Sequence, residues 1–336
     1  MTDVYMLLGG FLLLTFGGEL LVRGAVSFAG ALGISPLIIG LTFVGFGTSM
    51  PELVTSVQAA RVGAPGIAVG NFVGSNIANT LLVLGLAALV APIAMRKSAV
   101  KRDGIFVLAI SVAFSLIAYF YTLDRVVGIG FLTLLGLYLT YAYRQEAAEW
   151  QTWKKGHTSV YEKAEAYSHL RDGVHDLTSD EAKAARTALI KSLIMAITGL
   201  GIVIVGGTVL VNGAVDLARQ FNISESVIGL TIVAIGTSMP EIVTSLVAAM
   251  RKHSDVALGN ILGSNIYNIL AIGGTTALIA PTDVPTHIAQ FDNVVMVVAA
   301  VLLLTFARTG YRVARLEGLI LLTFYIAYIW TLWPVT

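Results

Sequence analysis

GFGTSMPELVTS, residues 45–56, places a glutamate inside a long apolar run of the chain. Glu52 directly follows Pro51, and a proline disturbs a helix because it has no backbone N–H to donate. An ionisable side chain in such a run is costly, and residues of this kind usually have a function. AIGTSMPEIVTS, residues 234–245, repeats the arrangement with Glu241. The two glutamates are therefore the first candidates for a functional site.

The composition is that of a membrane protein, with the lipid bilayer as its surroundings. Of the 336 residues, 56% are hydrophobic and 12% charged, with a mean hydropathy of +0.83, whereas soluble domains carry roughly 25% charged residues. The net charge of +1 gives no reason to expect nucleic acid as a partner. The absence of cysteine excludes disulfides and zinc–thiolate sites. The first residues lack a basic region and a cleavage site, so they predict a transmembrane helix and not a cleaved signal.

Ten segments are long and apolar enough to cross a membrane, which takes about 20 residues. They are residues 4–28, 36–60, 67–91, 104–122, 126–143, 188–214, 225–249, 256–280, 290–307 and 317–334. A polar stretch, residues 144–187, separates the fifth span from the sixth. Within it, Thr178 and Glu181 form a capping box that predicts the start of a helix leading into the sixth span. The predicted fold class is an all-α polytopic membrane protein.

The basic residues predict the orientation. If the N-terminus lies outside, 18 Lys and Arg residues fall on the inner connections and three, Arg61, Arg125 and Arg219, on the outer ones. Cytoplasmic connections carry an excess of positive charge. We therefore expect a multi-pass protein of the cell membrane, with both termini outside and the loop 144–187 in the cytoplasm.

An internal repeat is the strongest feature of the sequence. A shift of 189 residues aligns residues 34–92 with residues 223–281, with 32 identities in 59 positions and no gap. Each half, residues 1–143 and 188–336, holds five predicted spans, so the second half enters the membrane from the opposite side. The sequence thus predicts ten transmembrane helices as two inverted five-helix repeats, an architecture of many secondary transporters.

The repeated stretches supply a set of oxygen-bearing side chains. Within a helix, Thr48, Ser49 and Glu52 stand three or four positions apart and share one face. On the next span Ser75 and Asn79 are four apart. The second half offers the equivalent residues Thr237, Ser238, Glu241, Ser264 and Asn268. Two carboxylates with hydroxyl, amide and carbonyl oxygens suit Ca²⁺ and Na⁺, and do not suit zinc or copper. Because two carboxylates balance one Ca²⁺ or two monovalent ions, the set predicts an ion exchanger.

Structural roles for these polar residues stay open at this point. A buried glutamate can be a structural hydrogen-bond partner, and a Gly-Ser-Asn cluster is typical of close helix packing. We assign most of the residues of this cluster in the first half to packing: Gly70, Asn71, Gly74 and Asn76. Asn71 and Asn260 are expected to hold backbone groups. Five aspartates near predicted helix ends are expected to be solvated, namely Asp3, Asp124, Asp216, Asp283 and Asp292, and Asp103 is expected at the interface.

The two GTSMPE segments, each followed by GN-x-x-GSN-I-x-N, resemble the alpha repeats of the sodium/calcium exchanger family in the cation/calcium antiporter superfamily. The motifs occupy residues 40–80 and 229–269, and the likeness is greatest to the compact prokaryotic members. The spacing of 27 residues between the glutamate and the last asparagine is the same in both copies. The likeness covers most of the chain apart from the central loop.

The resemblance implies an antiporter that exchanges Na⁺ for Ca²⁺ by alternating access, with helices one and six as a sliding gate. It implies that Glu52 and Glu241 are the paired cation ligands. Further oxygen ligands would come from Thr48, Ser49, Ser75, Asn79, Thr237, Ser238, Ser264 and Asn268, and from the backbone carbonyls of Gly45 and Ala234. Asparagine at both polar positions, where potassium-dependent relatives carry aspartate, argues against an extra potassium ion. No cofactor is expected besides the transported ions, and a monomer able to transport is expected.

Two other functions remain as alternatives. A proton-coupled divalent-cation antiporter of the same fold would use a glutamate as its proton carrier, because a buried carboxylate pair can hold protons. An ion channel is the other alternative, which a closed, charged site at the midplane disfavours. The spans contain no HExxH motif and no serine–histidine pairing, so an enzyme is not expected.

Overall fold

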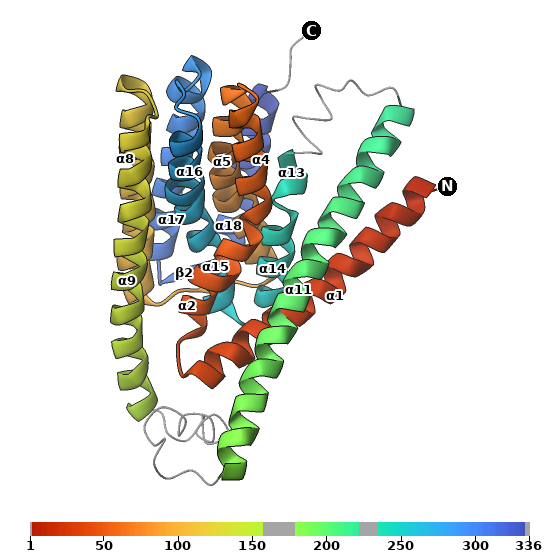
Figure 1. Cartoon of the computed structure of the whole chain (residues 1–336), viewed down its shortest axis with the longest axis vertical. Helices are drawn as coiled ribbons and strands as arrows, with labels where there is room; N and C mark the ends of the chain where they lie inside the picture. Colours follow the sequence, from red (N-terminus) through yellow and green to blue (C-terminus); the bar gives the residue numbers. More distant parts are fainter. Residues whose placement is uncertain (1, 157–178, 222–233, 333–336) are drawn as a thin grey trace.

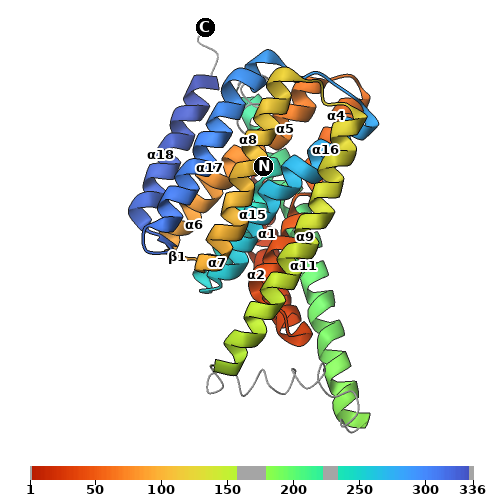
Figure 2. The same cartoon turned by 90° about the vertical axis from the view of Figure 1, so that its left-hand side faces the viewer.

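The computed structural model describes residues 2–156, 179–221 and 234–332, and its long elements are all helices. Figure 1 shows a bundle of upright helices with two long, tilted helices beside it. In Figure 2 the bundle is seen from the side of α8, α9, α17 and α18. The bundle contains both GTSMPE segments, so the candidate site lies within it.

The two tilted helices are α1 (Thr2–Leu32) and α11 (Ser179–Gln220), which run in opposite directions along each other (Figure 1). Glycines bring their backbones together. A Cβ built on Gly24 would lie 2.4 Å from the Ala196 nitrogen, and one on Gly199 would lie 2.3 Å from the Leu21 nitrogen. Only 28% of each span is buried. The pair therefore contacts the bundle on a narrow face and leaves the rest for lipid.

Residues 36–61 form a bent span. It consists of α2 (Pro36–Ile39), the π-helical segment η1 (Gly40–Val44), α3 (Gly45–Thr48) and α4 (Met50–Arg61). The axis bends by 42° at Ser49, which has non-helical backbone angles of φ −83° and ψ 4°. Pro51 lies in the first turn of α4, where a missing N–H has no helical partner to lose. The proline therefore begins a second helix and does not kink a continuous one. In the second half, α13 (Ala234–Thr237) and α14 (Met239–Met250) break at Ser238 in the same way.

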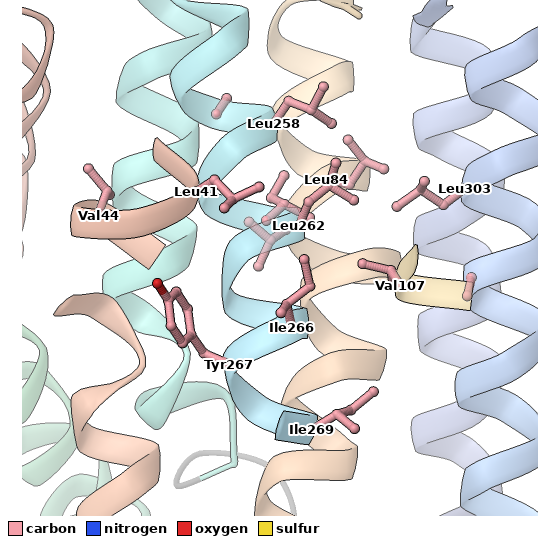
Figure 3. Close-up of a cluster of buried hydrophobic side chains, with 14 of the residues drawn as sticks. Leu41, Val44, Leu84, Val107, Leu258, Leu262, Ile266, Tyr267, Ile269 and Leu303 are labelled. Atoms are coloured by element: carbon pink, nitrogen blue, oxygen red, sulfur yellow. The ribbon is translucent and has the colours of Figure 1, made fainter. Parts of the chain in front are cut away.

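The centre of the bundle is one fully enclosed span, made of α15 (Ser254–Ile266), η5 (Tyr267–Ile272) and α16 (Gly273–Ile279). Its counterpart is α5 (Pro65–Ala78), η2 (Asn79–Val83) and α6 (Leu84–Val90). Figure 3 shows apolar side chains of α15 packed among those of neighbouring elements: Leu258, Leu262 and Ile266 with Leu41, Leu84, Val107 and Leu303. Because protein surrounds α15, its polar side chains face protein groups and not lipid.

The remaining helices complete the bundle. α7 (Lys97–Ala99), η3 (Val100–Gly104) and α8 (Ile105–Phe120) form one span, as do η6 (Ile288–Asp292) and α17 (Asn293–Arg308). α9 (Arg125–Gly156) and α18 (Arg315–Leu332) follow them. Two short strands, β1 (Ile93–Ala94) and β2 (Arg312–Val313), pair antiparallel between helix ends.

The described residues contain eight single helices that are long and apolar enough to span a membrane, and the bent segment makes a ninth. The predicted span 225–249 begins among residues 222–233, outside the described residues, and its second part is α14. The count of ten therefore stays a prediction. α9 continues to Gly156, beyond the predicted end of the fifth span. α11 begins at Ser179, directly after the predicted capping residue Thr178, which itself lies outside the described residues.

The 189-residue offset relates helices and strands of the two halves as well as their amino-acid sequences. α14 and α16 lie at this offset from α4 and α6, and η5 and η6 lie within one residue of it from η2 and η3. The pairing of β1 with β2 has a counterpart in the single bridge between Leu123 and Thr282, again within one residue. The corresponding helices α1 and α11 run antiparallel (Figure 1). Both features are those that an inverted repeat requires.

A cluster of buried charges joins η3 to α9. Arg102 donates from Nη2 to Asp103 Oδ2 at 2.8 Å and from Nη1 to Glu146 Oε2 at 3.0 Å. The hydroxyl of Tyr138 donates to Asp103 Oδ1 at 2.5 Å, and Arg96 forms an ion pair with Glu146. Asp103 is fully buried within the protein, and its expected depth at the membrane interface stays a prediction. Its charge is balanced inside the protein and not by water.

Candidate cation site

Glu52 and Glu241 lie in the first turns of α4 and α14, and both are buried, with 0% and 1% of their surface exposed. Within the part of the chain that the structure describes, neither carboxylate oxygen of Glu52 has a hydrogen-bond partner, and Glu241 Oε2 has none either. A buried carboxylate without a partner is strongly unfavourable. A helix N-terminus favours negative charge only modestly. These oxygens therefore have the environment of ligands for a cation.

The carboxylate of Glu241 meets residues of the first half. Ser49 Oγ donates to Glu241 Oε1 at 3.3 Å, and Ser264 Oγ lies 3.5 Å from the same oxygen. Ser264 Oγ also lies 3.3 Å from the carbonyl oxygen of Gly45 and 3.3 Å from Thr48 Oγ1. Five of the predicted site residues, drawn from both halves, are thus in mutual contact.

The other predicted residues are buried or line a neighbouring cavity. Ser238, Asn79 and Asn268 are fully buried, and their side-chain oxygens have no hydrogen-bond partner among the described residues. Ser75 and Thr237 line a cavity beside the site. Ala234 begins α13, as Gly45 begins α3.

Two asparagines hold the helices that carry the glutamates, as expected from the sequence. Asn71 Nδ2 donates to the carbonyl oxygen of Glu52 at 3.0 Å and to Ser56 Oγ at 2.9 Å. Asn260 makes the equivalent bonds in the second half, to the Glu241 carbonyl oxygen at 3.4 Å and to Ser245 Oγ at 3.0 Å. In addition, Asn260 Oδ1 accepts a bond from Thr48 at 3.1 Å. This last contact, for which the sequence carries no signal, couples the two halves.

We expect Asn260→Ala to weaken calcium binding by about 10- to 100-fold, the usual effect of losing a group that orients a metal ligand. The variant frees the Glu241 carbonyl oxygen and Thr48 at once. Asn265→Ala is the matched control, because Asn265 lies on the same helix but donates to Thr80 at 2.9 Å. Calcium binding to both purified variants measures the difference. Equal affinities in the two variants would contradict the positioning role of Asn260.

Glycines bring α15 close enough for Ser264 to reach Gly45. A Cβ built on Gly263 would lie 2.5 Å from the carbonyl oxygen of Leu41, and both neighbouring elements would have to move apart. The equivalent glycine of the first half, Gly74, has nothing within 4 Å of an added Cβ, and Gly70 meets only Ile288 at 3.6 Å. The close packing expected of Gly70 and Gly74 stays a prediction, because residue 230, at the repeat offset from Leu41, lies outside the described residues.

We expect Gly263→Ala to destabilise the protein by about 1–3 kcal/mol, the usual effect of overpacking a buried site. Gly136→Ala, at an exposed position of α9 with nothing within 4 Å of the new Cβ, should leave stability unchanged or raise it by up to about 1 kcal/mol. Thermal unfolding in detergent compares the two. Equal stability of both variants would show that the close contact at Leu41 is not required.

A cavity of about 550 Å³ adjoins the site. Ser75, Asn71 and Thr237 line it near the site, and His287, Asp292 and Tyr328 are also among its lining residues. Asp292 was expected to be solvated, yet only 10% of its side chain is exposed, because η6 carries it into the protein. The sequence offered one signal for it: Asp292 lies at the repeat offset from Asp103.

The chemistry of the donors limits the ligand. The site presents carboxylate, hydroxyl, amide and carbonyl oxygens, and the described residues contain no group of three or more His, Cys, Asp and Glu side chains that would hold a metal ion. Oxygen donors with two carboxylates fit a hard cation such as Ca²⁺ or Na⁺. They do not fit a transition metal, which favours nitrogen and sulfur ligands.

Known proteins resemble the chain in sequence and in structure. The profile of the family described as "Sodium/calcium exchanger protein" matches residues 2–144 and 191–333. The chain is 38% identical to the putative antiporter CaxA of Alkalimonas amylolytica, over 95% of each chain. It is 33% identical to the sodium/calcium exchanger MaX1 of Methanosarcina acetivorans, over 96% of each chain. A solved structure of the sodium-calcium exchanger NCX_Mj, soaked with 10 mM Na⁺ and no Ca²⁺, matches 99% of each chain with a TM-score of 0.81 and 30% identity.

Proposed function

Because the chain belongs to the sodium/calcium exchanger family, we propose that it is an antiporter that exchanges Na⁺ for Ca²⁺ through a site built on Glu52 and Glu241. The observation that carries this proposal is the pair of buried carboxylates with unpartnered oxygens, one from each repeat, beside hydroxyl and carbonyl oxygens of the described residues. The protein would lie in the cell membrane, with both termini outside and residues 144–187 connecting the two repeats in the cytoplasm.

Charge balance explains why such a site exchanges ions. Two carboxylates neutralise one Ca²⁺ or two Na⁺, so either load gives a site close to neutral. With no cation bound, the two charges face each other in a protein interior, which is strongly unfavourable. A change of access from one side to the other would therefore require a loaded site, and this requirement couples the two ion flows.

The arrangement of α1 and α11 supports alternating access. The two helices contact each other far more than they contact the bundle. Gly18 of α1 packs against Val243 of α14, the helix that carries Glu241. A shift of the pair along its axis would cover one side of the site and uncover the other. The narrow contact with the bundle leaves the pair free to move as a unit.

Calcium uptake into proteoliposomes tests the proposal. Vesicles that contain the purified protein are loaded with Na⁺ and diluted into Na⁺-free buffer with radioactive Ca²⁺, and K⁺-loaded vesicles are the control. We expect uptake only into the Na⁺-loaded vesicles. Uptake that follows an imposed pH gradient and ignores Na⁺ would contradict the proposal and favour the proton-coupled alternative. Uptake that needs no counter-ion would indicate a channel.

A further inference from the structure

An acidic and a basic side chain lie together in the lining of the cavity beside the site, near its outer end. Among its described lining residues, Asp292 is the acidic one and His287 the basic one. At its inner end the lining includes Ser75 and Thr237, two of the proposed ligands. With the predicted orientation, η6 begins at the outer face. An ion moving from outside toward Ser75 through this cavity would therefore pass the Asp292–His287 pair.

Both oxygens of Asp292 are engaged. Tyr328 donates to Oδ1 at 2.9 Å, and His287 Nδ1 lies 3.0 Å from Oδ2. Only 10% of the Asp292 side chain is exposed, whereas 64% of His287 is exposed. The carboxylate is therefore placed to act through its electric field and not as a direct ligand. The imidazole, in contrast, is open to protons from the surrounding solution.

The equivalent carboxylate of the first repeat has a different partner. Asp103 also accepts a bond from a tyrosine, Tyr138, and it is paired with Arg102. An arginine stays charged at every pH that proteins meet, so the charge of Asp103 is permanently balanced. The residue at the repeat offset from Arg102 is Phe291. Asp292 thus has a titratable partner where its counterpart has a fixed one.

We propose that the Asp292–His287 pair controls the entry of cations from the outer side, and that protonation of His287 closes this entry electrostatically. The proposal rests on the antiporter function proposed above. With a neutral imidazole the lining carries one negative charge, and a cleft with one sign of charge concentrates cations. With an imidazolium the two charges cancel, and this attraction is lost. An imidazole changes its charge between about pH 5 and 8.

No other described lining group changes charge in this range. The remaining titratable side chains that face Asp292 are the phenols of Tyr325 and Tyr328 on α18, and phenols ionise near pH 10. α5 lines the opposite wall with glycine, serine and asparagine, and α8 and α17, which also pack near η6, add no charged residue to the described lining. Among the described lining groups of the cavity, the change of charge in this range is thus assigned to His287.

The test measures the Ca²⁺ concentration that gives half-maximal uptake from the outer side. Na⁺-loaded spheroplasts that express the protein are assayed at outer pH values of about 5.5 and 7.5, which bracket imidazole titration, with the inner pH held constant. The variants are His287→Gln, Asp292→Asn and both together. His253→Gln is the matched control, because His253 precedes α15 at the opposite end of the bundle. Burial lowers the pKa of His253 and Arg251 lowers it further, against a smaller opposing effect of Glu19, so its neutral form is favoured.

At the lower pH we expect His287→Gln to need roughly tenfold less Ca²⁺ than the wild type, the lower end of known electrostatic steering effects. At the higher pH the two should agree. At the higher pH, Asp292→Asn should need roughly tenfold more Ca²⁺ than the wild type. At the same pH, the double variant should match Asp292→Asn. Proton competition at the buried glutamates affects all variants alike, so the comparison isolates His287.

Everted vesicles from the same cells present the other face, and there His287→Gln should behave as the wild type. The proposal is overturned if His287→Gln follows the wild type at both pH values in spheroplasts, or if the double variant still responds as His287→Gln does. A wild type without Na⁺-dependent uptake would instead contradict the antiporter function on which the proposal rests. Because the His287 side chain is exposed, we expect His287→Gln to fold as the wild type does.

Discussion

Glu52→Gln and Glu241→Gln are each expected to abolish sodium-dependent calcium uptake while the protein remains folded. Glutamine keeps the shape of glutamate but removes its charge. A Ca²⁺ ion beside a single carboxylate would leave a net charge of +1 in the membrane interior, where an unbalanced charge is strongly unfavourable. Since the loss of an orienting group alone weakens metal binding 10- to 100-fold, the loss of a charged ligand should weaken it by more than about 100-fold. Uptake into Na⁺-loaded proteoliposomes and calcium binding to the purified variants measure the effect.

Stability separates this prediction from simple misfolding. Both side chains are buried with unpartnered oxygens among the described residues, so a neutral amide should leave thermal stability in ion-free buffer unchanged or raise it. Ser56→Ala is a useful control, because Ser56 lies one turn from Glu52 on α4 and bonds Asn71 without belonging to the proposed ligand set. Uptake retained by both glutamine variants would refute the assignment of the site.

Arg102→Met should cause the largest loss of stability, about 3–5 kcal/mol, because breaking the buried ion pair leaves the charge of Asp103 uncompensated. Arg102 binds both Asp103 and Glu146, and neither carboxylate has any exposed surface. Methionine retains much of the length and apolar volume of the side chain, so the effect reports on charge and hydrogen bonding. Thermal unfolding of the purified protein in detergent is the measurement.

Arg23→Met is the matched control for this second prediction. Arg23 also pairs with a glutamate, Glu19, but 61% of its side chain is exposed, and Arg251 binds the same glutamate at 2.7 Å. An exposed ion pair contributes about 0–1 kcal/mol, so this variant should be nearly as stable as the wild type. If Arg102→Met proved as stable as Arg23→Met, the buried cluster would not be a structural anchor of η3 and α9.

The membrane class, the family and the contact of Glu241 with hydroxyl groups were predictable from the sequence. Two copies of one motif at a constant offset imply equivalent environments, and this equivalence predicts one set that includes Ser49, Ser264 and Glu241, which the structure brings into contact. The backbone role of Asn71 and Asn260 was predictable for the same reason. A repeated asparagine near a repeated break in a helix has backbone groups to satisfy.

Features that depend on contacts between distant helices were not predictable. The burial of Asp103 and Asp292 was not predictable, because sequence alone does not show that Tyr138 and Tyr328 reach across from another helix to bind them. The sequence predicted a disturbed helix at Pro51, whereas the break lies at Ser49. A proline in the first turn of a helix does not disturb it, but the sequence alone does not show that α4 begins there.

The most direct test of the central claim is the position of calcium in the protein. Crystals grown with Ca²⁺ would show the ion by its anomalous scattering, independently of any transport assay. We predict a strong peak between the carboxylates of Glu52 and Glu241, with oxygen ligands at roughly 2.3–2.6 Å, the usual range for Ca²⁺, and the Gly45 carbonyl beside it. Calcium found elsewhere, with both glutamates left unliganded, would contradict the proposed site.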